Sequence, residues 1–396
     1  MTAAVAGVST RTREWVSVFA VMFFCTWAGN QFSPLLLLYQ QKQHYSTTAV
    51  NAFLGVYVLG LIPAFLLSGA LSDRHGRRPV MLAGVVAALA TSVALAFSET
   101  GPLMICLGRF LAGVAVGTAT CVGTTWLKEL SQPPYDVGAD RSAGARRAAL
   151  SFSLGSASGA VVAGLIAQWG PWPEQLPFVI HIVLTLPFAW LVRRVPETGM
   201  RAHHPLRVPA VGHVLVVAAP WVFAAAALAY GYLPVLLAPA TGGLGIAYAT
   251  LLTAVALGAS ALVQPWAKRV GRGLLIALAL IVVSTVLIAA AVWWMSWPLG
   301  VVAAVVAGAG IGMGMTSGIL EVQRIARPSD LAASTGVFYA IAYSGFLVPT
   351  LLSATAGITG VAVPGLLLIV AGLVVVCGLL VMRSHRRRGF RAAEVP

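Results

Sequence analysis

The chain has 396 residues, of which 59% are hydrophobic and only 9% are charged. A soluble domain carries about 25% charged residues, so this composition excludes an ordinary soluble protein and predicts that lipid covers most of the surface. The formal net charge of +14 would suggest a nucleic-acid partner for a soluble protein. The positions of the charges, given below, exclude nucleic acid and favour membrane lipid as a partner.

Twelve apolar stretches are long enough to cross a membrane as helices, because a hydrocarbon core about 30 Å thick needs roughly 20 apolar residues. The predicted fold class is therefore an all-α membrane protein with twelve transmembrane helices. In chain order, the stretches are Trp15–Leu38, Ala52–Leu71, Pro79–Phe97, Leu103–Leu127, Ala148–Gln168, Gln175–Val192, Val211–Leu237, Ala247–Trp266, Gly273–Met295, Trp297–Leu320, Leu331–Ala354 and Val361–Met382.

The basic residues define the orientation of these spans. If the N-terminus lies in the cytoplasm, every Lys and Arg falls in a cytoplasmic segment except Lys42, in an outer loop, and Arg109, within a span. This distribution follows the positive-inside rule. It predicts a multi-pass protein of the plasma membrane with both termini in the cytoplasm.

The loop between the second and third spans is the most informative segment of the chain. Residues 69 to 79 have the sequence Gly-Ala-Leu-Ser-Asp-Arg-His-Gly-Arg-Arg-Pro. This sequence resembles the signature loop between helices 2 and 3 of the major facilitator superfamily, with Gly, Asp, Arg, Gly, Arg and Arg at the same spacing. The resemblance implies a secondary transporter with two pseudo-symmetric six-helix bundles, most like the twelve-helix drug:proton antiporters.

The resemblance also implies that this loop acts as a gate. Asp73 is expected to pair with Arg77, or with the start of the eleventh span near Asp330, in the outward-open state. The alternative is a loop that only enforces topology, but topology alone would not require Asp and two glycines here. The expected gating residues are Gly69, Asp73, Arg74, Gly76, Arg77, Arg78 and Asp330.

The two halves of the chain resemble each other. Segment 30–37 is matched by segment 230–237, each with a proline at its fifth position, and loop 73–77 is matched by loop 268–272. Paired halves of this kind place a substrate site between them, near the middle of the membrane. The predicted domains are an N-terminal six-helix bundle at 1–194, a cytoplasmic linker at 195–210, and a C-terminal six-helix bundle with a basic cytoplasmic tail at 211–396.

Arg109 is the only Lys or Arg well inside a span. A charge there costs about 2.5–3.5 kcal/mol unless it has a partner or a water-filled cavity. Segment 107–110, followed by Gly113 and Gly117, resembles the helix 4 motif of the superfamily, whose arginine is associated with proton coupling or with holding anionic groups. The alternative is an arginine satisfied by the carbonyl groups or polar side chains of neighbouring helices.

Other polar and aromatic residues of the spans are candidates for binding a substrate. Trp27, Asn30 and Gln31 share one helical face, and amides facing lipid would be wasteful, so this face is either a substrate-facing patch or a polar clamp between helices. Tyrosines suit amphipathic organic compounds, although each could also be ordinary core or part of an interfacial belt. The predicted substrate-binding residues are Trp27, Asn30, Gln31, Tyr57, Arg109, Tyr230, Tyr339 and Tyr343.

The sequence places no Asp or Glu in the middle of a span. Proton coupling would then use His181, Arg109 with water, or interfacial acids, while His181 could instead be a buried neutral residue bonded to a neighbouring helix. A core without carboxylates favours neutral or anionic substrates. The cysteines and the pair His203-His204 lack metal-ligand spacing, so no metal and no cofactor are expected.

Together these features favour a monomeric exporter of small organic molecules that is driven by proton exchange. The fifth span lacks the proline of the superfamily's antiporter motif, which weakens the assignment of export. The first alternative is an importer or facilitator of a small neutral or anionic metabolite. A membrane-embedded enzyme has no supporting motif in the sequence, and the intact signature loop argues against a non-transporting sensor.

Overall fold

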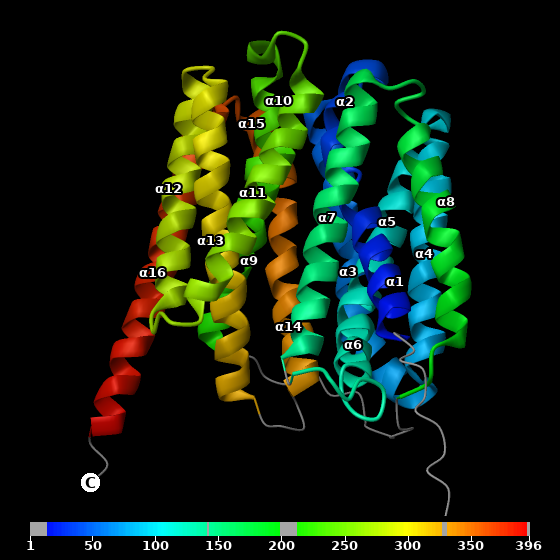
Figure 1. The fold of residues 1–396 in the computed structure, drawn as a ribbon. Helices are drawn as coiled ribbons and strands as arrows, with labels where there is room; N and C mark the ends of the chain where they lie inside the picture. The colour runs from blue at the N-terminus through cyan, green and yellow to red at the C-terminus, as the bar shows by residue number, and fades with distance from the viewer. Residues whose placement is uncertain (1–13, 141, 199–211, 327–330, 394–396) are drawn as a thin grey trace, which may run out of the picture.

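The computed structural model describes residues 14–140, 142–198, 212–326 and 331–393, and within these ranges the chain forms only helices and the loops between them. Twelve helical segments are long and apolar enough to cross a membrane. Figure 1 shows these segments running up and down the molecule in two groups that lie side by side. The prediction of an all-α membrane protein with twelve spans is confirmed.

The first six spans form one group. In chain order, its main helices are α1 (Glu14–Asn30), η1 (Ser33–Leu35), α2 (Leu36–Lys42), α3 (Thr47–His75), α4 (Arg77–Ala96), α5 (Pro102–Thr118), η3 (Ala119–Gly123), α6 (Thr124–Leu130), α7 (Ala143–Trp169), α8 (Leu176–Leu191) and η4 (Val192–Arg194). We call this group the N-terminal bundle.

The last six spans form the second group, the C-terminal bundle. Its helices are α9 (His213–Ala226), η5 (Ala227–Tyr232), α10 (Leu233–Leu237), η6 (Ala238–Thr241), α11 (Gly245–Ala267), α12 (Gly273–Trp293), α13 (Trp297–Ile325), α14 (Leu331–Tyr343), η8 (Ser344–Leu347), α15 (Val348–Thr359) and α16 (Val363–Ala393). The domain boundaries given above stay a prediction, and linker residues 199–211, with His203 and His204, lie outside the described residues.

The first span of each bundle is broken, and the breaks occur at matching positions. In the first span, α1 gives way to the short 3₁₀ helix η1, which contains Pro34. In the seventh span, α9 gives way to the π-helical turn η5, and Pro234 follows at the start of α10. Proline removes a backbone donor, so a regular helix cannot continue unchanged through it. Discontinuous helices at corresponding places in two halves indicate where a transporter binds its substrate.

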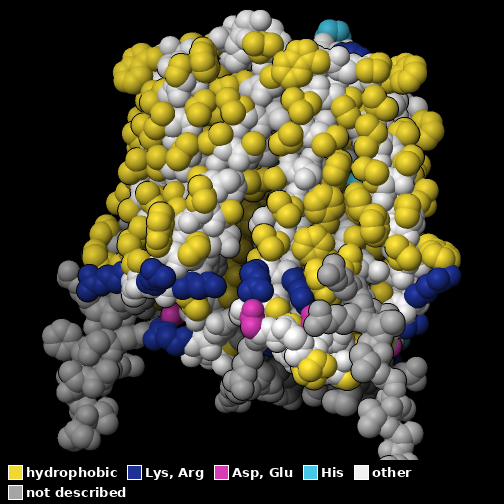
Figure 2. Space-filling view, viewed as in Figure 1, with side chains coloured by type: hydrophobic (Ala, Val, Ile, Leu, Met, Phe, Trp, Pro, Cys, Tyr) yellow, Lys and Arg dark blue, Asp and Glu magenta, His cyan; other side chains and the backbone are white. Residues whose placement is uncertain are grey.

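The two ends of the molecule differ in charge. Figure 2 shows Lys and Arg side chains in a band along the lower edge of the apolar surface. We call this end, where the signature loop and the loop between α11 and α12 lie, the basic end, and the other end the opposite end. Between the two ends, large apolar side chains face outward, with Leu262 74% and Trp293 70% exposed. Contact of these apolar side chains with lipid costs no free energy, whereas contact with water would be unfavourable.

Candidate functional site

A small cavity lies between the two bundles, close to the breaks in the first and seventh spans. Its lining includes Asn30, Tyr57 and Arg109 from the N-terminal bundle, and Tyr230 and Tyr343 from the C-terminal bundle. The cavity volume is about 40 Å³, room for about three water molecules, whereas pockets for organic ligands measure about 300–1,000 Å³. A ligand of that size would fit only if the bundles moved apart.

Arg109 is the only Lys, Arg, Asp, Glu or His among the residues that line this cavity. Its side chain is buried, and it donates hydrogen bonds from Nη1 to the Gly29 carbonyl at 3.0 Å and from Nε to the Phe53 carbonyl at 3.3 Å. The guanidinium lies over the rings of Phe32 and Tyr57, 4.5 and 4.6 Å from their centroids. No carboxylate within the described ranges forms an ion pair with it. The positive charge is held in place but not neutralised.

Two glycines allow Arg109 to reach across to α3. A Cβ atom on Gly60 of α3 would collide with the Phe110 carbonyl of α5, and one on Gly113 of α5 would collide with the Tyr57 carbonyl of α3. Without side chains at these two positions, the backbones of α3 and α5 pack directly together. The Phe53 carbonyl therefore comes within reach of the guanidinium.

Aromatic rings form the side of the cavity that belongs to the C-terminal bundle. The Tyr343 ring stacks on Phe223, with centroids 3.8 Å apart, and on Phe346 at 5.7 Å. Tyr57 approaches Tyr343 from the N-terminal bundle at 6.1 Å. The sequence analysis missed Phe223, although it precedes Tyr230 by seven residues, two turns along the same helical face. The site thus combines a cation on one side with stacked rings on the other.

The structure brings only some of the predicted binding residues to this cavity. Asn30, Tyr57, Arg109, Tyr230 and Tyr343 line it, whereas three other predicted residues do not. The residues outside it are Trp27 and Gln31, which are buried within the N-terminal bundle, and Tyr339, which stacks on Phe65 at a centroid distance of 4.9 Å.

Gln31 belongs to a buried chain of hydrogen bonds that ends at His181. Its amide donates to Ser92 Oγ at 2.9 Å, and Ser92 Oγ lies 2.8 Å from His181 Nδ1. His181 Nε2 lies 2.9 Å from the Phe24 carbonyl, which can only accept, so Nε2 carries a proton, and in the neutral ring Nδ1 accepts from Ser92. A neutral imidazole satisfies this chain at both nitrogens. The arrangement matches the alternative of a buried neutral histidine bonded to a neighbouring helix.

The signature loop forms a network of charged groups at the basic end. Arg77 Nη1 lies 2.5 Å from Asp73 Oδ1, and Arg77 Nη2 lies 3.0 Å from Glu129 Oε1 on α6. Gly76 has a φ of 102°, a backbone conformation that residues with a side chain rarely adopt. Arg74 is exposed, and Gly69 has no atom near the place where a Cβ would lie. Asp330 lies outside the described residues, so any pairing with it stays a prediction.

The segment that follows the sixth span packs onto this loop, a contact that the sequence analysis did not anticipate. The Glu197 carboxylate accepts hydrogen bonds from the backbone N–H groups of Arg77 and Arg78, at 2.6 and 3.0 Å. It thereby caps the N-terminus of α4, where unpaired N–H groups favour a negative charge. Thr198 Oγ1 donates to Glu129 Oε2 at 2.5 Å. The segment leading to the second bundle is therefore bonded to the same network as Asp73.

At the opposite end, hydrogen bonds join the two bundles directly. Gln168 of α7 donates to the Gly243 carbonyl at 3.1 Å and accepts from the Ala247 N–H at 3.0 Å. Thr350 of α15 donates to the Asn51 carbonyl of α3 at 2.8 Å. In Figure 1, α7 and α11 lie close together near this end and farther apart toward the basic end. The opposite end of the cavity is closed in this conformation.

Near this closure, polar groups tie the loops of the N-terminal bundle together. Glu174 lies 3.5 Å from Lys42 Nζ and accepts from Gln43 at 2.8 Å. Gln175 donates to Glu99 at 2.6 Å, and this hydrogen bond lowers the pKa of the Glu99 carboxyl below its ordinary value. Within the described ranges, no group of three or more His, Cys, Asp and Glu side chains could hold a metal ion.

Twelve apolar spans in two bundles that are joined at one end, with a buried arginine in the cavity between them, have the architecture of a membrane transport protein rather than of an enzyme. The sequence model of the Major Facilitator Superfamily matches residues 18–349. The chain therefore belongs to the Major Facilitator Superfamily.

Curated relatives agree with this assignment. The chain is 28% identical over 199 residues to the uncharacterised MFS-type transporter YceJ of Bacillus subtilis, covering 50% of this chain and 48% of that protein. It is 28% identical over 218 residues to the multidrug transporter MdfA of Escherichia coli, covering 53% of this chain and 50% of that protein. The chain thus aligns with about half the length of these relatives.

Solved structures show the same fold at low sequence identity. A mutant of the nucleoside transporter NupG aligns with a TM-score of 0.72 and 13% identity, covering 94% of this chain and 99% of that chain. A D-xylose–proton symporter aligns with a TM-score of 0.69 and 15% identity, covering 93% of this chain and 94% of that chain. These similarities support the twelve-helix transporter fold.

Proposed function

We propose that this protein is a secondary active exporter of small organic molecules that works by alternating access and proton exchange. One observation carries the proposed substrate site: Arg109 is buried between the bundles, lines the cavity and has no acidic partner there. A buried cation that is bonded only to carbonyl groups retains attraction for an incoming negative or strongly polar group. The similarity to multidrug transporters named MdfA supports export.

The lining indicates the class of substrate. The stacked rings of Phe223, Tyr343 and Phe346 offer flat apolar surface, and Asn30 and Tyr230 add polar groups. Such a lining suits flat, amphipathic organic compounds. Since the cavity contains a cation and no carboxylate, neutral and anionic compounds fit it better than cations do.

The proposed movement of the two bundles starts from the conformation seen here, which is closed at the opposite end. Breaking the contacts of Gln168 and Thr350 would open the cavity there, while the bundles would approach each other at the basic end. Asp73, Arg77 and Glu129 would act as the gate at the basic end. The pair of Asp73 and Arg77 is expected in the outward-open state, yet it is already formed in this conformation, which is closed at the opposite end. Water beside Arg109 would carry the exchanged proton, because the cavity lining contains no Asp, Glu or His.

The second candidate is an importer or facilitator of a small neutral or anionic metabolite. The positive cavity favours it as much as it favours export, because the charge at Arg109 selects substrates without setting a direction. The dependence of flux on the proton gradient distinguishes an exporter from an importer or facilitator.

The test uses the purified protein in proteoliposomes loaded with neutral, anionic and cationic fluorescent compounds. Export by proton exchange predicts uphill movement of neutral or anionic compounds when a pH gradient is imposed, and its loss when a protonophore collapses the gradient. Flux that only runs downhill and ignores the gradient would instead establish a facilitator. Liposomes without protein and liposomes with an Arg109→Gln variant serve as controls.

We further propose that the protein is a monomer of the plasma membrane with its basic end, and both termini, in the cytoplasm. The band of Lys and Arg along one edge of the apolar surface supports this orientation (Figure 2). A reporter fused to the C-terminus that is active only in the cytoplasm should give a signal. A signal from a reporter that is active only outside would contradict the orientation.

A further inference from the structure

A second, larger cavity lies at the basic end of the C-terminal bundle, away from the site between the bundles. It is formed by the loop between α11 and α12, the start of α12 and the end of α13, and its volume is about 630 Å³. The charged side chains that line it are Lys268, Arg269, Arg272, Glu321 and Arg324. None of these residues contributes to the transport site described above.

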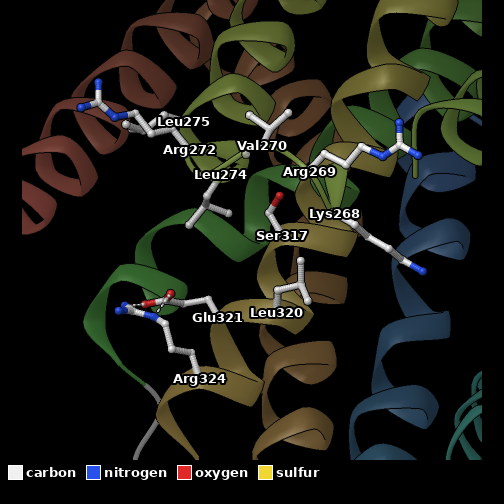
Figure 3. Close-up of a pocket in the computed structure, with 12 residues that line it drawn as sticks. Lys268, Arg269, Val270, Arg272, Leu274, Leu275, Ser317, Leu320, Glu321 and Arg324 are labelled. Carbon is white, nitrogen blue, oxygen red and sulfur yellow. Dashed lines mark hydrogen bonds and ion pairs between the residues drawn. The ribbon is translucent and has the colours of Figure 1, made fainter. Parts of the chain in front are cut away.

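The charge of this second cavity is strongly positive. Glu321 is neutralised by Arg324, whose Nη2 and Nε lie 2.7 and 2.8 Å from its carboxylate oxygens. Within the described part of the chain, Lys268, Arg269 and Arg272 form no ion pair. Figure 3 shows Arg272 extending to one side of the loop and Arg269 and Lys268 to the other. Three cations therefore surround the cavity without a counter-ion among the described residues.

Among the described residues that line the cavity, some hydrogen-bond donors have no partner. Helix α12 begins at Gly273, and no side chain caps its N-terminus. Leu275 and Ile276 donate to the Arg272 carbonyl, so the N–H groups of Gly273 and Leu274, together with the helix dipole, favour an anion. The Ser317 hydroxyl packs against Gly273, is buried and has no hydrogen-bond partner. A buried hydroxyl without a partner is unfavourable, so a ligand that accepts its proton would stabilise the site.

The surroundings of the cavity are apolar. Val270 and Leu320 line it and are 37% and 41% exposed, and Trp266, just before the loop, is 62% exposed. The band of Lys and Arg at this height lies along the lower edge of the apolar surface (Figure 2), where lipid headgroups meet a membrane protein. A ligand with a negative head and an apolar tail matches both features.

We propose that this second cavity binds the phosphate-bearing headgroup of an anionic phospholipid. The phosphate oxygens would accept hydrogen bonds from Ser317 and from the start of α12, and Lys268, Arg269 and Arg272 would surround its charge. The acyl chains would lie on the outward apolar surface beside Leu320. This binding does not depend on the transport function proposed above.

The test measures lipid binding to the purified full-length protein by native mass spectrometry and thermal shift. The lipids are phosphatidylglycerol, as the anionic probe, and phosphatidylcholine, as the neutral one. Since each cation near an anionic headgroup is worth about fivefold in affinity, the double variant Arg269→Gln/Arg272→Gln should bind phosphatidylglycerol roughly 30-fold more weakly. Ser317→Ala, which keeps the charges, should reduce the thermal shift caused by phosphatidylglycerol.

The matched control removes two cations from the basic end of the N-terminal bundle, in the double variant Lys128→Gln/Arg146→Gln. This control variant should bind phosphatidylglycerol with the same affinity as the unmodified protein. Equal loss in the two double variants would overturn the proposal, because binding would then follow net charge. Displacement of the lipid by millimolar inorganic phosphate or glycerol phosphate would also overturn it, in favour of a soluble phosphate ligand. Because the readout is binding, failure of transport would leave the result unaffected.

Discussion

At the scale of single residues, Arg109 has two properties that rarely occur together in a membrane span: complete burial and the lack of an acidic partner among the described residues. Carbonyl groups and aromatic rings hold the guanidinium in place. These contacts stabilise the charge without cancelling it, as a site for a negative or polar substrate requires.

Replacing Arg109 with Gln should therefore weaken substrate binding and slow transport far more than the same change at Lys42. Losing a charge-assisted hydrogen bond costs about 1.5–3 kcal/mol, so substrate affinity should fall roughly 10- to 150-fold. Lys42 lies 49% exposed at the opposite end and should tolerate the change to Gln with little effect. Equal effects of the two variants on proteoliposome flux would contradict the assignment of Arg109 to the transport site.

His181 is buried too, but its hydrogen bonds indicate a different role. Because Ser92 and the Phe24 carbonyl occupy both ring nitrogens, we expect His181→Ala to leave the shape of the pH profile of transport unchanged. Breaking the buried chain should lower the melting temperature, since it removes a hydrogen-bond partner from Ser92 at a cost of about 1–3 kcal/mol. A shifted pH profile at unchanged stability would make His181 the proton site after all.

At the scale of helices, the packing of α3 against α5 positions both Tyr57 and Arg109. Gly113→Ala should force these backbones apart, since the added Cβ would collide with the Tyr57 carbonyl, and overpacking of this kind costs about 1–3 kcal/mol. Gly258 of α11 is a matched control, because it is exposed and has open space beside it. Thermal unfolding should show a lower melting temperature for Gly113→Ala and no loss for Gly258→Ala. The reverse order would exclude close packing as the reason for Gly113.

The proposed gate is also a feature of the helix scale, because its network joins α3, α4 and α6 to the segment with Glu197 and Thr198. Asp73→Asn removes the charge that pairs with Arg77 and should slow transport about 5- to 30-fold while leaving insertion intact, the range expected for a coupling energy of about 1–2 kcal/mol. Asp140→Asn removes a pairing between exposed side chains, Asp140 and Arg146, and should change transport by less than about 3-fold. Near-normal flux in Asp73→Asn would reduce the loop to a topological role.

At the scale of the whole molecule, the direct contacts at the opposite end determine which side of the cavity is closed. Gln168→Leu removes two hydrogen bonds between the bundles, each worth about 0.5–1.5 kcal/mol, and should shift the population toward an outward-open state. The measurement is the labelling rate of a Ser33→Cys variant by an impermeant thiol reagent added outside, in a background without the native cysteines.

This rate should rise several-fold in the Gln168→Leu background. Gln175→Leu is the control, because Gln175 bonds to Glu99 within the N-terminal bundle and does not join the bundles. If both changes raise the rate equally, the effect is general loosening of the loops and not release of the closure.

The sequence by itself determined the membrane class, the twelve spans, the charge asymmetry and the family. These follow from hydropathy, from the positions of Lys and Arg and from one loop motif, all local properties of the chain. It also singled out Arg109, which lines the cavity, and Asp73 and Arg77, which form an ion pair, because a charge in a span and a charged loop between spans are conspicuous in any sequence. Their roles in binding and gating stay predictions.

Only the tertiary structure decided which polar residues face the cavity. Asn30 and Gln31 are neighbours in the chain, yet Asn30 lines the cavity and Gln31 donates to Ser92 inside the N-terminal bundle. The docking of Glu197 onto α4 and the joining of the bundles by Gln168 likewise connect residues more than 70 positions apart. The physical reason is that helical periodicity gives the faces of one span, whereas the neighbour that each face meets depends on how all the spans pack together.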